Sequence, residues 1–526
     1  MKCSNNMPPD ILLLTEEDFP EENRYFAMIN LLGAVRRRVR LPHYIHLNIT
    51  LLASVLQREG FSCELADNFL RLPPATQRFE RLLKQAPPVV GLATTFLFRE
   101  ETLRDITRRI RDLSPHSIII LGGPSILQFP EWRRYGDISV LYDGERTLPA
   151  VLKTIKSGGN LRDIPGIEFQ KDGHKVATEP SEFTPLSELP LPDWSHLGHG
   201  RHGVYPIETQ RGCVYKCKYC TYPVYQSGDS GTQLHPIPRI IDELRHNYEN
   251  WGITYYRFID ATFTFPRKRA EDICREIIRS KLPIQWSCFG RVDNMTPELA
   301  NLMAQAGCRC IFFGVESGDD SMLKRMRKDF RVEHIHGGVQ CTHEAGMATV
   351  GSFFVGFPGE TEETLANTEK IIIDSHFTFL SVGSYWVDPN APASLQNEEY
   401  GLTGRGGQWK HNTMDSTQAE ALTGRLLSNV LSKNAAHLGF DFTIASLVNL
   451  GLDYDEAMRY MMDKGLLINY RLAKTSGHSL DHFNPKEVER AWSNYQRATL
   501  KIAALGRPYY TQESARPLLP IAELSI

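Results

Sequence analysis

The sequence lacks any apolar stretch long enough to cross a membrane, which takes about 20 consecutive apolar residues. Runs such as Ile11 to Leu14 and Ile118 to Leu121 are only as long as a strand. The start of the chain, MKCSNNMPP, also lacks the apolar segment and the small-residue cleavage site of a secretory signal. We therefore expect a soluble cytoplasmic protein with no membrane partner.

Cysteine is scarce for the length of the chain, and neither sign of charge is in large excess. Ten cysteines in 526 residues are too few and too clustered for a disulfide scaffold. A net charge of −3 gives no polycation, and no long Lys/Arg run marks a nucleic-acid surface. The composition predicts a globular protein of two or three domains in a reducing compartment. Its partner would be a small-molecule or peptide substrate and not a nucleic acid.

Three of the ten cysteines stand within eight residues. Cys213, Cys217 and Cys220 have the spacing C-x3-C-x2-C, so one loop can present three thiolates to a metal. An iron–sulfur cluster usually takes four cysteines, and a loop with three leaves one iron open to a ligand that is not protein. Structural zinc is an alternative that needs a fourth, distant ligand, and buried structural thiols are another. The candidates for that fourth ligand are Cys288, Cys308 and Cys310.

Strands alternate with amphipathic helices from Asp10 to about residue 155, which is the pattern of a doubly wound α/β layer. We expect an N-terminal Rossmann-like domain over residues 1–165. Ligands of such folds bind beyond the carboxyl ends of the parallel strands. The residues expected there are Thr15, Thr94, Thr95, Phe96, Gly122, Gly123, Pro124, Ser125, Gly144 and Glu145. For the glycine pair, a plain tight turn is the commoner use.

Residues 166–198 are expected to separate two domains. They hold a predicted hairpin with Asp172 and Gly173 at its turn, and then a proline-rich segment that predicts an extended linker. Six further strand–helix units predict a partial (β/α)6 barrel of the TIM type over residues 199–392. Chemistry in such barrels sits at the carboxyl ends of the strands.

Helical periodicity predicts an all-α domain over residues 393–526 that caps the barrel. The candidates for lining a substrate site there are Tyr385, Trp386, Asp388, Trp409 and His411. Ordinary core packing is the commoner role for such aromatic side chains.

Residues 211–220, RGCVYKCKYC, resemble the cluster loop of the radical S-adenosylmethionine enzymes. In that family a [4Fe-4S] cluster binds S-adenosylmethionine at its open iron, and an electron from the cluster cleaves the sulfonium to a 5'-deoxyadenosyl radical. The resemblance implies that Cys213, Cys217 and Cys220 hold the cluster and that Tyr219 packs near the adenine. Val214 departs from the family, in which proline is common at this position.

The resemblance continues at the ends of the barrel strands. GVESG at residues 314–318 and GFPGET at residues 356–361 are typical of one branch of the family. The contacts to S-adenosylmethionine that the resemblance implies are Tyr219, Asp260, Ser287, Arg291, Glu316 and Gly356. Ala261 departs from the family, which often has a second acidic residue there. For Glu316, Arg291 and Gly356 a purely structural role is the alternative.

The N-terminal domain resembles the cobalamin-binding domain of one class of these enzymes. LGGPS at residues 121–125 and DGERTL at residues 143–148 carry the resemblance. The Asp-x-His-x-x-Gly signature is missing, because the first strand is followed by TEEDF at residues 15–19. We therefore expect cobalamin to bind with its dimethylbenzimidazole tail detached and with no histidine on the cobalt.

Together the two resemblances imply a cobalamin-dependent radical S-adenosylmethionine methyltransferase. Such an enzyme moves a methyl group from methylcobalamin to an unactivated carbon, and an external donor of the flavodoxin or ferredoxin type reduces its cluster. A cyclase or rearrangement enzyme with the same cofactors is one alternative, and a non-catalytic cobalamin or iron–sulfur sensor is another. A methylthiotransferase acting on RNA is disfavoured, because only Cys3 and Cys63 precede the cluster loop.

Overall fold

The computed structural model describes residues 7–18, 45–70, 73–197, 203–226 and 231–506. The chain divides into two compact units. We call them the N-terminal unit, which holds the described residues up to 197 together with residues 225 and 226, and the barrel unit, which holds the other described residues.

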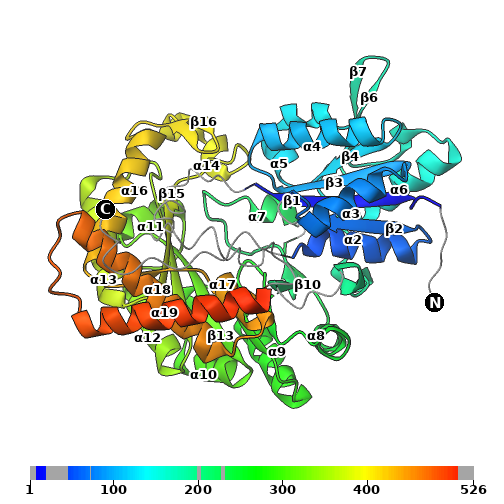
Figure 1. The fold of residues 1–526 in the computed structure, drawn as a ribbon. Coiled ribbons are helices and arrows are strands. Elements are labelled where there is room, and N and C mark those ends of the chain that lie inside the picture. The colour runs from blue at the N-terminus through cyan, green and yellow to red at the C-terminus, as the bar shows by residue number, and fades with distance from the viewer. Residues whose placement is uncertain (1–6, 19–44, 71–72, 198–202, 227–230, 507–526) are drawn as a thin grey trace. The chain divides into compact units, whose positions relative to one another are not determined.

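The N-terminal unit is built on one sheet of seven strands in the order β2-β1-β3-β4-β5-β6-β7 (Figure 1). The strands are β1 Ile11–Glu17, β2 Cys63–Asp67, β3 Val89–Phe96, β4 Ile118–Gly122, β5 Ile138–Val140, β6 Ile167–Lys171 and β7 His174–Ala177. The first five are parallel. The strand–helix alternation predicted from Asp10 to about residue 155 is therefore confirmed, and with it the doubly wound Rossmann-like fold.

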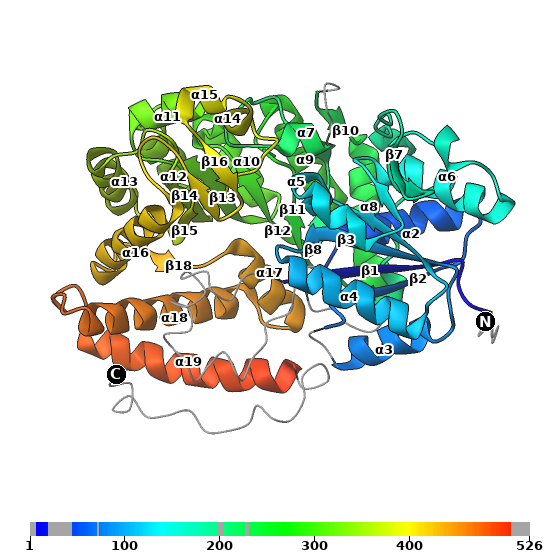
Figure 2. The same ribbon diagram turned by 90° about the horizontal axis from the view of Figure 1, so that it is seen from above.

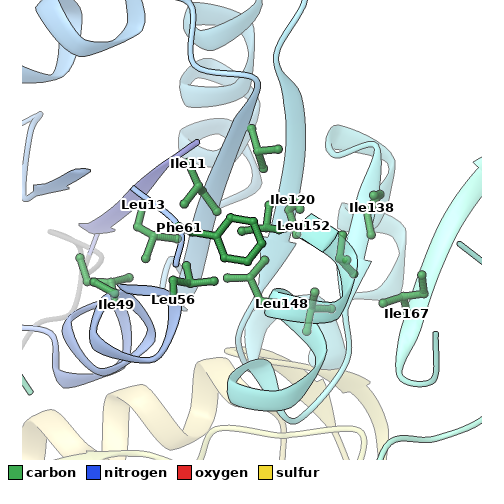
Figure 3. Close-up of a cluster of buried hydrophobic side chains, with 14 of the residues drawn as sticks. Ile11, Leu13, Ile49, Leu56, Phe61, Ile120, Ile138, Leu148, Leu152 and Ile167 are labelled. Carbon is green, nitrogen blue, oxygen red and sulfur yellow. The ribbon is translucent and has the colours of Figure 1, made fainter. Parts of the chain in front are cut away.

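Helices cover both faces of this sheet because alternate side chains of each strand point to opposite faces. The helices are α2 Leu47–Arg58 and α6 Gly144–Ser157 on one face, with α3 Pro73–Leu83 and α4 Glu100–Leu113 on the other. On the α2 face Leu13 packs with Leu56, Phe61 and Leu148 in one buried cluster (Figure 3). On the opposite face Leu14 belongs to a second buried cluster.

The hairpin expected in the linker belongs to the sheet. β6 pairs antiparallel with β5, and β7 pairs antiparallel with β6. Ile167 and Phe169 face inward and join the core of the α2 face, so their burial holds the hairpin in place. The N-terminal unit therefore continues past residue 165, where we placed its boundary.

The proline-rich segment is docked along its length and does not form a free linker. Leu186 and Leu189 pack on Leu51 and Val55 of α2. Arg58 adds a hydrogen bond from its guanidinium to the carbonyl oxygen of Glu188, 2.6 Å away. Proline keeps this segment extended, and its leucines supply the contact.

The barrel unit holds seven parallel strands in the order β18-β15-β14-β13-β12-β11-β8. They are β8 Tyr205–Ile207, β11 Tyr255–Phe258, β12 Gln285–Gly290, β13 Cys308–Glu316, β14 Ala348–Val355, β15 Phe379–Ser384 and β18 His437–Leu438. The helices between them are α8 Ile237–Trp251, α9 Arg267–Ser280, α10 Pro297–Gln305, α11 Asp320–Met326, α12 Glu333–Glu344, α13 Glu362–Ser375 and α16 Ser416–Ser432. Six of these strands were predicted.

The C-terminal part is mostly helical, as predicted, but it is not a separate domain. The short strand β18 extends the barrel sheet, and β16 Thr403–Arg405 pairs with β17 Gln408–Lys410. The helices are α17 Asp441–Leu450, α18 Tyr454–Thr475 and α19 Pro485–Gly506. α18 and α19 lie side by side (Figure 2). No helix in the described ranges is long and apolar enough to span a membrane.

Candidate cofactor sites

The cysteine loop follows β8, the first strand of the barrel. β9 Gln210–Arg211 pairs with β10 Gln233–Leu234 and fixes the start of the loop. Cys217 is buried, while Cys213 and Cys220 are half-buried. The backbone N–H of Cys220 donates to the carbonyl oxygen of Cys217 at 3.2 Å, so these two cysteines share one tight turn.

The thiols of this loop fit a cluster better than a zinc ion. Burial raises the pKa of Cys220 to about 12 and also raises that of Cys217, so metal binding there must displace protons. Among the described side chains, no three of His, Cys, Asp or Glu converge as one ion would require. The thiolates of a cluster bind different irons and need not converge on one point.

The distant cysteines do not complete a zinc site within the described structure. Cys288, Cys308 and Cys310 are 0% exposed in β12 and β13. The Cys308 thiol contacts the carbonyl oxygen of Cys310 at 3.8 Å. These thiols are core residues, which removes the candidates for the fourth ligand of structural zinc.

Asp260 holds the start of the cysteine loop. Its carboxylate accepts the backbone N–H of Thr209 at 2.7 Å, that of Gln210 at 3.1 Å, and the hydroxyl of Thr209. Burial raises the pKa of Asp260 to about 7. Both oxygens expected to meet the amino group of S-adenosylmethionine therefore already bind the loop.

Tyr219 and Glu316 come together as the resemblance implied, and a third residue joins them. The Tyr219 hydroxyl donates to Oε1 of Glu316 at 3.0 Å, and Nζ of Lys328 lies 3.1 Å from the Tyr219 oxygen and 3.4 Å from Glu316 Oε1. Lys328 is only 4% exposed. Sequence reasoning missed it, because a lysine in the basic run KRMRK, residues 324–328, is typical of a solvated surface.

Arg291 braces the loop from the end of β12. Its guanidinium lies 3.7 Å from the centre of the Tyr215 ring, pairs with Asp293 at 2.9 Å, and donates to the carbonyl oxygen of Lys328 at 2.5 Å. Arg291 therefore pairs with a carboxylate, which is the structural role given above as its alternative. The partner is Asp293 and not Glu316.

Ser287 belongs to a different polar group, within the barrel. Its hydroxyl donates to Oδ2 of Asp441 at 2.7 Å, and Nε of Arg257 contacts the same oxygen at 2.8 Å. Arg257 and Ser287 are register partners on β11 and β12, while Asp441 begins α17. The structure therefore joins Ser287 to the C-terminal helices and not to the Tyr219 group.

The turn after β14 is packed against the C-terminal segment. The N–H of Gly356 donates to Oε2 of Glu360 at 2.5 Å, and its carbonyl oxygen lies 2.9 Å from Nε2 of His411. The His411 ring stacks on Trp409 at 4.9 Å. A Cβ on Gly356 would lie 2.7 Å from the Trp409 ring. These two predicted substrate-lining residues therefore support the turn.

The other lining candidates differ in exposure. Tyr385 is 3% exposed and Trp386 is 38% exposed, while the Asp388 carboxylate accepts the hydroxyl of Thr221 at 3.3 Å. Thr221 directly follows the last cysteine. Asp388 therefore belongs to the support of the cysteine loop.

The barrel wall carries small residues at the level reached by the loop. Gly314, Ser352 and Ser381 are register partners on β13, β14 and β15, and all three are half-buried. Gly314 leaves room for the Glu316 carboxylate, because a Cβ on Gly314 would lie 2.7 Å from Glu316 Oε1 and 3.6 Å from Lys328 Nζ. The opposite charges of Lys328 and Glu316 therefore meet beside this wall.

In the N-terminal unit, the strand order β2-β1-β3-β4-β5 places the topological switch point between β1 and β3. Several residues predicted to bind cobalamin meet nearby. Ser125 Oγ contacts the carbonyl oxygen of Thr94 at 2.5 Å, and Thr94 Oγ1 contacts that of Gly122 at 2.9 Å. Gly123 has φ +105°, and a Cβ there would lie 3.1 Å from the Thr95 amide nitrogen.

The remaining predicted residues begin α6. Asp143 caps the helix by accepting the N–H of Arg146 at 2.8 Å, so Gly144 and Glu145 form its first turn at the carboxyl end of β5. Thr15 follows the apolar residues of β1 and is 0% exposed. Its hydroxyl has no hydrogen-bond partner within the described structure. A buried hydroxyl without a partner beside a switch point fits a ligand-binding edge.

Two family models match the chain. The Radical SAM superfamily model matches residues 207–372, and the B12 binding domain model matches residues 35–152. The first covers the cysteine loop and the barrel through most of α13. The second covers the four parallel strands β2, β3, β4 and β5 and most of α6, but not β1.

Two relatives are similar to this chain over more than half of its length. An uncharacterised methyltransferase of Pyrococcus horikoshii is 28% identical over 339 residues, 62% of this chain and 72% of that protein. The anaerobic magnesium-protoporphyrin IX monomethyl ester cyclase of Rubrivivax gelatinosus is 23% identical over 318 residues, 56% of each chain. This chain thus spans about half of the cyclase.

A solved structure has the same fold over nearly the whole chain. The radical S-adenosylmethionine methyltransferase TsrM from Kitasatospora setae, solved with cobalamin and a [4Fe-4S] cluster, aligns with a TM-score of 0.64 at 16% identity. The alignment covers 89% of this chain and 100% of TsrM. The alignment extends well beyond the residues that the two family models match.

Proposed function

This chain belongs to the cobalamin-dependent radical S-adenosylmethionine enzymes, and we propose that it methylates an unactivated carbon of a small-molecule or peptide substrate. When bound, the cluster supplies the electron that cleaves S-adenosylmethionine, and cobalamin carries the methyl group. The observation that carries the proposal is a three-cysteine loop at the mouth of a barrel, in one chain with a B12 binding domain. A named methyltransferase among the relatives supports methyl transfer over other chemistry.

The residues of the chain have separate tasks in this proposal. Cys213, Cys217 and Cys220 hold the cluster and leave one iron for S-adenosylmethionine. Lys328 and Glu316, 3.4 Å apart, offer opposite charges for the carboxylate and the amino or hydroxyl groups of that cofactor. Asp260 and Arg291 position the loop, because the Asp260 carboxylate accepts the N–H groups of Thr209 and Gln210 and the Arg291 guanidinium lies over the Tyr215 ring.

A cyclase with the same cofactors is the second candidate, and the matched cyclase of Rubrivivax gelatinosus favours it. The two functions differ in the fate of the methyl group of S-adenosylmethionine. A methyltransferase gives that group away and leaves S-adenosylhomocysteine, whereas a cyclase leaves only 5'-deoxyadenosine and methionine.

The test is anaerobic incubation of the reconstituted full chain with dithionite, cobalamin and S-adenosylmethionine, followed by chromatography of the nucleosides. We expect both 5'-deoxyadenosine and S-adenosylhomocysteine. Deoxyadenosine alone would indicate the cyclase, and neither nucleoside would indicate a non-catalytic sensor. The triple variant Cys213→Ala, Cys217→Ala, Cys220→Ala should form no deoxyadenosine, while Cys341→Ala, on α12, should keep wild-type yield.

We also propose a compartment and an electron donor for the enzyme. A cluster held by thiolates needs a reducing compartment, so the proposed location is the cytoplasm, and the proposed electron donor is of the flavodoxin or ferredoxin type. No nucleic acid partner is proposed, because the net charge is −3.

A further inference from the structure

The middle of the cysteine loop is hydrogen-bonded to two other segments of the barrel unit. The backbone N–H of Lys218, which directly follows Cys217, donates to the carbonyl oxygen of Met326 at the end of α11, 2.9 Å away. The carbonyl oxygen of Lys218 accepts the N–H of Ala393 at 2.8 Å, and Ala393 lies in the short helix α14 Pro392–Leu395. The backbone beside the second cysteine is therefore fixed between α11 and α14.

The surface around these hydrogen bonds is made by three segments. We call residues 213–220, 324–329 and 392–400 the loop surface. Val214 is 50% exposed and Leu395 is 72% exposed, so each presents an apolar side chain to solvent. Leu395 stands two residues after Ala393, whose N–H binds Lys218. A partner that contacts Leu395 therefore lies near the backbone beside Cys217.

Unpaired cations stand in the exposed part of the loop surface. The turn after α11 separates them from the buried lysine, because Arg327 with φ +58° and Asp329 with φ +59° flank Lys328, which points inward at 4% exposure. Four exposed cations of the loop surface form no ion pair within the described structure, and they are Lys216, Lys324, Arg325 and Arg327.

The acidic residues of the loop surface do not cancel these charges. They are Asp329, Glu398 and Glu399. The Glu399 carboxylate already pairs with a further cation, Nζ of Lys218, at 3.3 Å. The loop surface is therefore positive, whereas the whole chain has a net charge of −3. A local charge that opposes the net charge steers an acidic partner to this place.

We propose that the loop surface is the docking site of the electron donor, and that this donor is a flavodoxin. The proposal rests on the proposed function, which requires an external reductant for the cluster. A flavodoxin is an acidic protein that presents the apolar edge of its flavin between carboxylates, which suits exposed Leu395 and Val214 beside cations. One electron passes from the reduced flavin to the cluster, and neither a bond nor a proton is transferred.

The first test is the rate at which fully reduced flavodoxin reduces the cluster of the reconstituted full chain, followed by anaerobic stopped-flow absorbance. Lys324→Glu combined with Arg327→Glu should slow this reaction by about tenfold or more at low ionic strength, because electrostatic steering raises association rates by at least about that factor. The difference should shrink as salt is added. Dithionite should reduce the clusters of wild type and variant to the same extent, because it needs no docking surface.

A matched variant separates local charge from net charge. Lys486→Glu combined with Arg497→Glu makes the same change in net charge on exposed positions of α19. Figure 2 shows α19 on the other side of the barrel unit from α11 and α14. This variant should keep the wild-type rate. Equal slowing in the two double variants would overturn the loop surface as the docking site.

Binding gives a readout that does not depend on the cluster. The affinity of the cluster-free full chain for flavodoxin, measured by calorimetry, should fall by about tenfold in the Lys324→Glu and Arg327→Glu variant. Lys324→Gln combined with Arg327→Gln should lie between it and wild type, and it answers the same question if the charge reversal prevents folding. Leu395→Ser should weaken binding even at high salt, where the charges are screened. Unchanged affinity in all three variants would overturn the proposal.

The levels of the proposal fail differently. If the wild-type protein forms 5'-deoxyadenosine with dithionite but flavodoxin reduces every variant at the wild-type rate, only the docking site is wrong. If a ferredoxin reduces the cluster with this dependence on charge and flavodoxin does not, the choice of donor is wrong. If dithionite yields no 5'-deoxyadenosine, the proposed function fails and the docking of a donor fails with it.

Discussion

The Nζ atom of Lys328 lies 3.1 Å from the hydroxyl oxygen of Tyr219, which places a buried cation beside the residue between the second and third cysteines of the loop. A positive charge in a region of low dielectric favours the more negative, reduced state of a cluster. Lys328→Met should therefore shift the midpoint potential of the cluster to a more negative value by on the order of 60 mV. For one electron this is about a tenfold change in the equilibrium constant for reduction. Redox titration followed by electron paramagnetic resonance, without S-adenosylmethionine, measures the shift.

Two variants control this prediction. Lys216→Met removes a positive charge from the same loop, but Lys216 is exposed and water screens it, so the potential should stay unchanged. Lys328→Arg should keep most of the wild-type potential. Equal shifts in Lys216→Met and Lys328→Met would show that burial of Lys328 has no electrostatic consequence.

Asp260 should make the stability of the cluster-free protein depend on pH. Burial raises its pKa from an ordinary 3.8 to about 7, so the folded state favours the protonated carboxyl. The protonated Asp260 carboxyl therefore contributes to the free energy of unfolding below about pH 4, and this contribution is lost as the pH rises through about 7. Its slope reaches at most about 1.4 kcal/mol per pH unit for one proton.

Asp260→Asn should remove that slope, because the amide is neutral and keeps an oxygen for the N–H groups of Thr209 and Gln210. The melting temperature of the variant should fall less than that of the wild type between pH 5 and pH 8. If the melting temperatures of the two proteins change in parallel with pH, Asp260 is ionised in both the folded and the unfolded state.

The buried ion pair between Arg257 and Asp441 should contribute more to the free energy of unfolding than a surface ion pair does. Asp441→Leu leaves the guanidinium buried without its partner, so the free energy of unfolding should fall by about 3–5 kcal/mol. Arg257→Met combined with Asp441→Leu should cost less than Asp441→Leu alone. Chemical denaturation of the cluster-free protein measures all three.

The matched surface pair is Lys433 and Glu369, with Nζ 3.0 Å from Oε1 and Lys433 46% exposed. Lys433→Met should cost no more than about 1 kcal/mol. A double variant at Arg257 and Asp441 as unstable as the single one would show that the loss comes from packing and not from an uncompensated charge.

Gly356→Ala should destabilise the turn after β14 for two reasons. Gly356 has φ +104°, which strains any other residue, and the new Cβ would lie 2.7 Å from Trp409. Gly346→Ala shares the positive φ of +81° but meets nothing within 4 Å. The melting temperature of Gly356→Ala should therefore fall clearly below that of Gly346→Ala, and equal values would mean that Trp409 moves aside freely.

The fold was largely predictable because its strands are buried on both faces. Ile118 to Leu121 and Cys310 to Val315 are continuous apolar runs, and each became a central strand of a parallel sheet. The hairpin β6–β7 was predicted, but its membership of the sheet was not. That membership depends on Ile167 and Phe169 reaching a core formed by distant helices.

The cysteine loop was predictable from spacing, whereas its supports were not. Ser287 and Asp441 are 154 residues apart, and no periodicity links them. Lys328 belongs to a residue type that is usually exposed, and only its burial distinguishes it from the other lysines. A single sequence shows residue type and spacing, while roles of this kind are set by partners that are remote along the chain.

The burial of the other thiols has a practical consequence for handling the protein. Of the nine cysteines in the described structure, Cys274, Cys288, Cys308, Cys310 and Cys341 are buried in the barrel unit. Burial also raises the pKa of Cys63 to about 12, so it offers little thiolate to an alkylating reagent. Brief native alkylation followed by mass spectrometry should therefore mark the half-buried Cys213 in molecules without a cluster and leave loaded molecules unmodified. The fraction of Cys213 that carries the adduct then measures the fraction of protein without a cluster, and no assay of iron is needed.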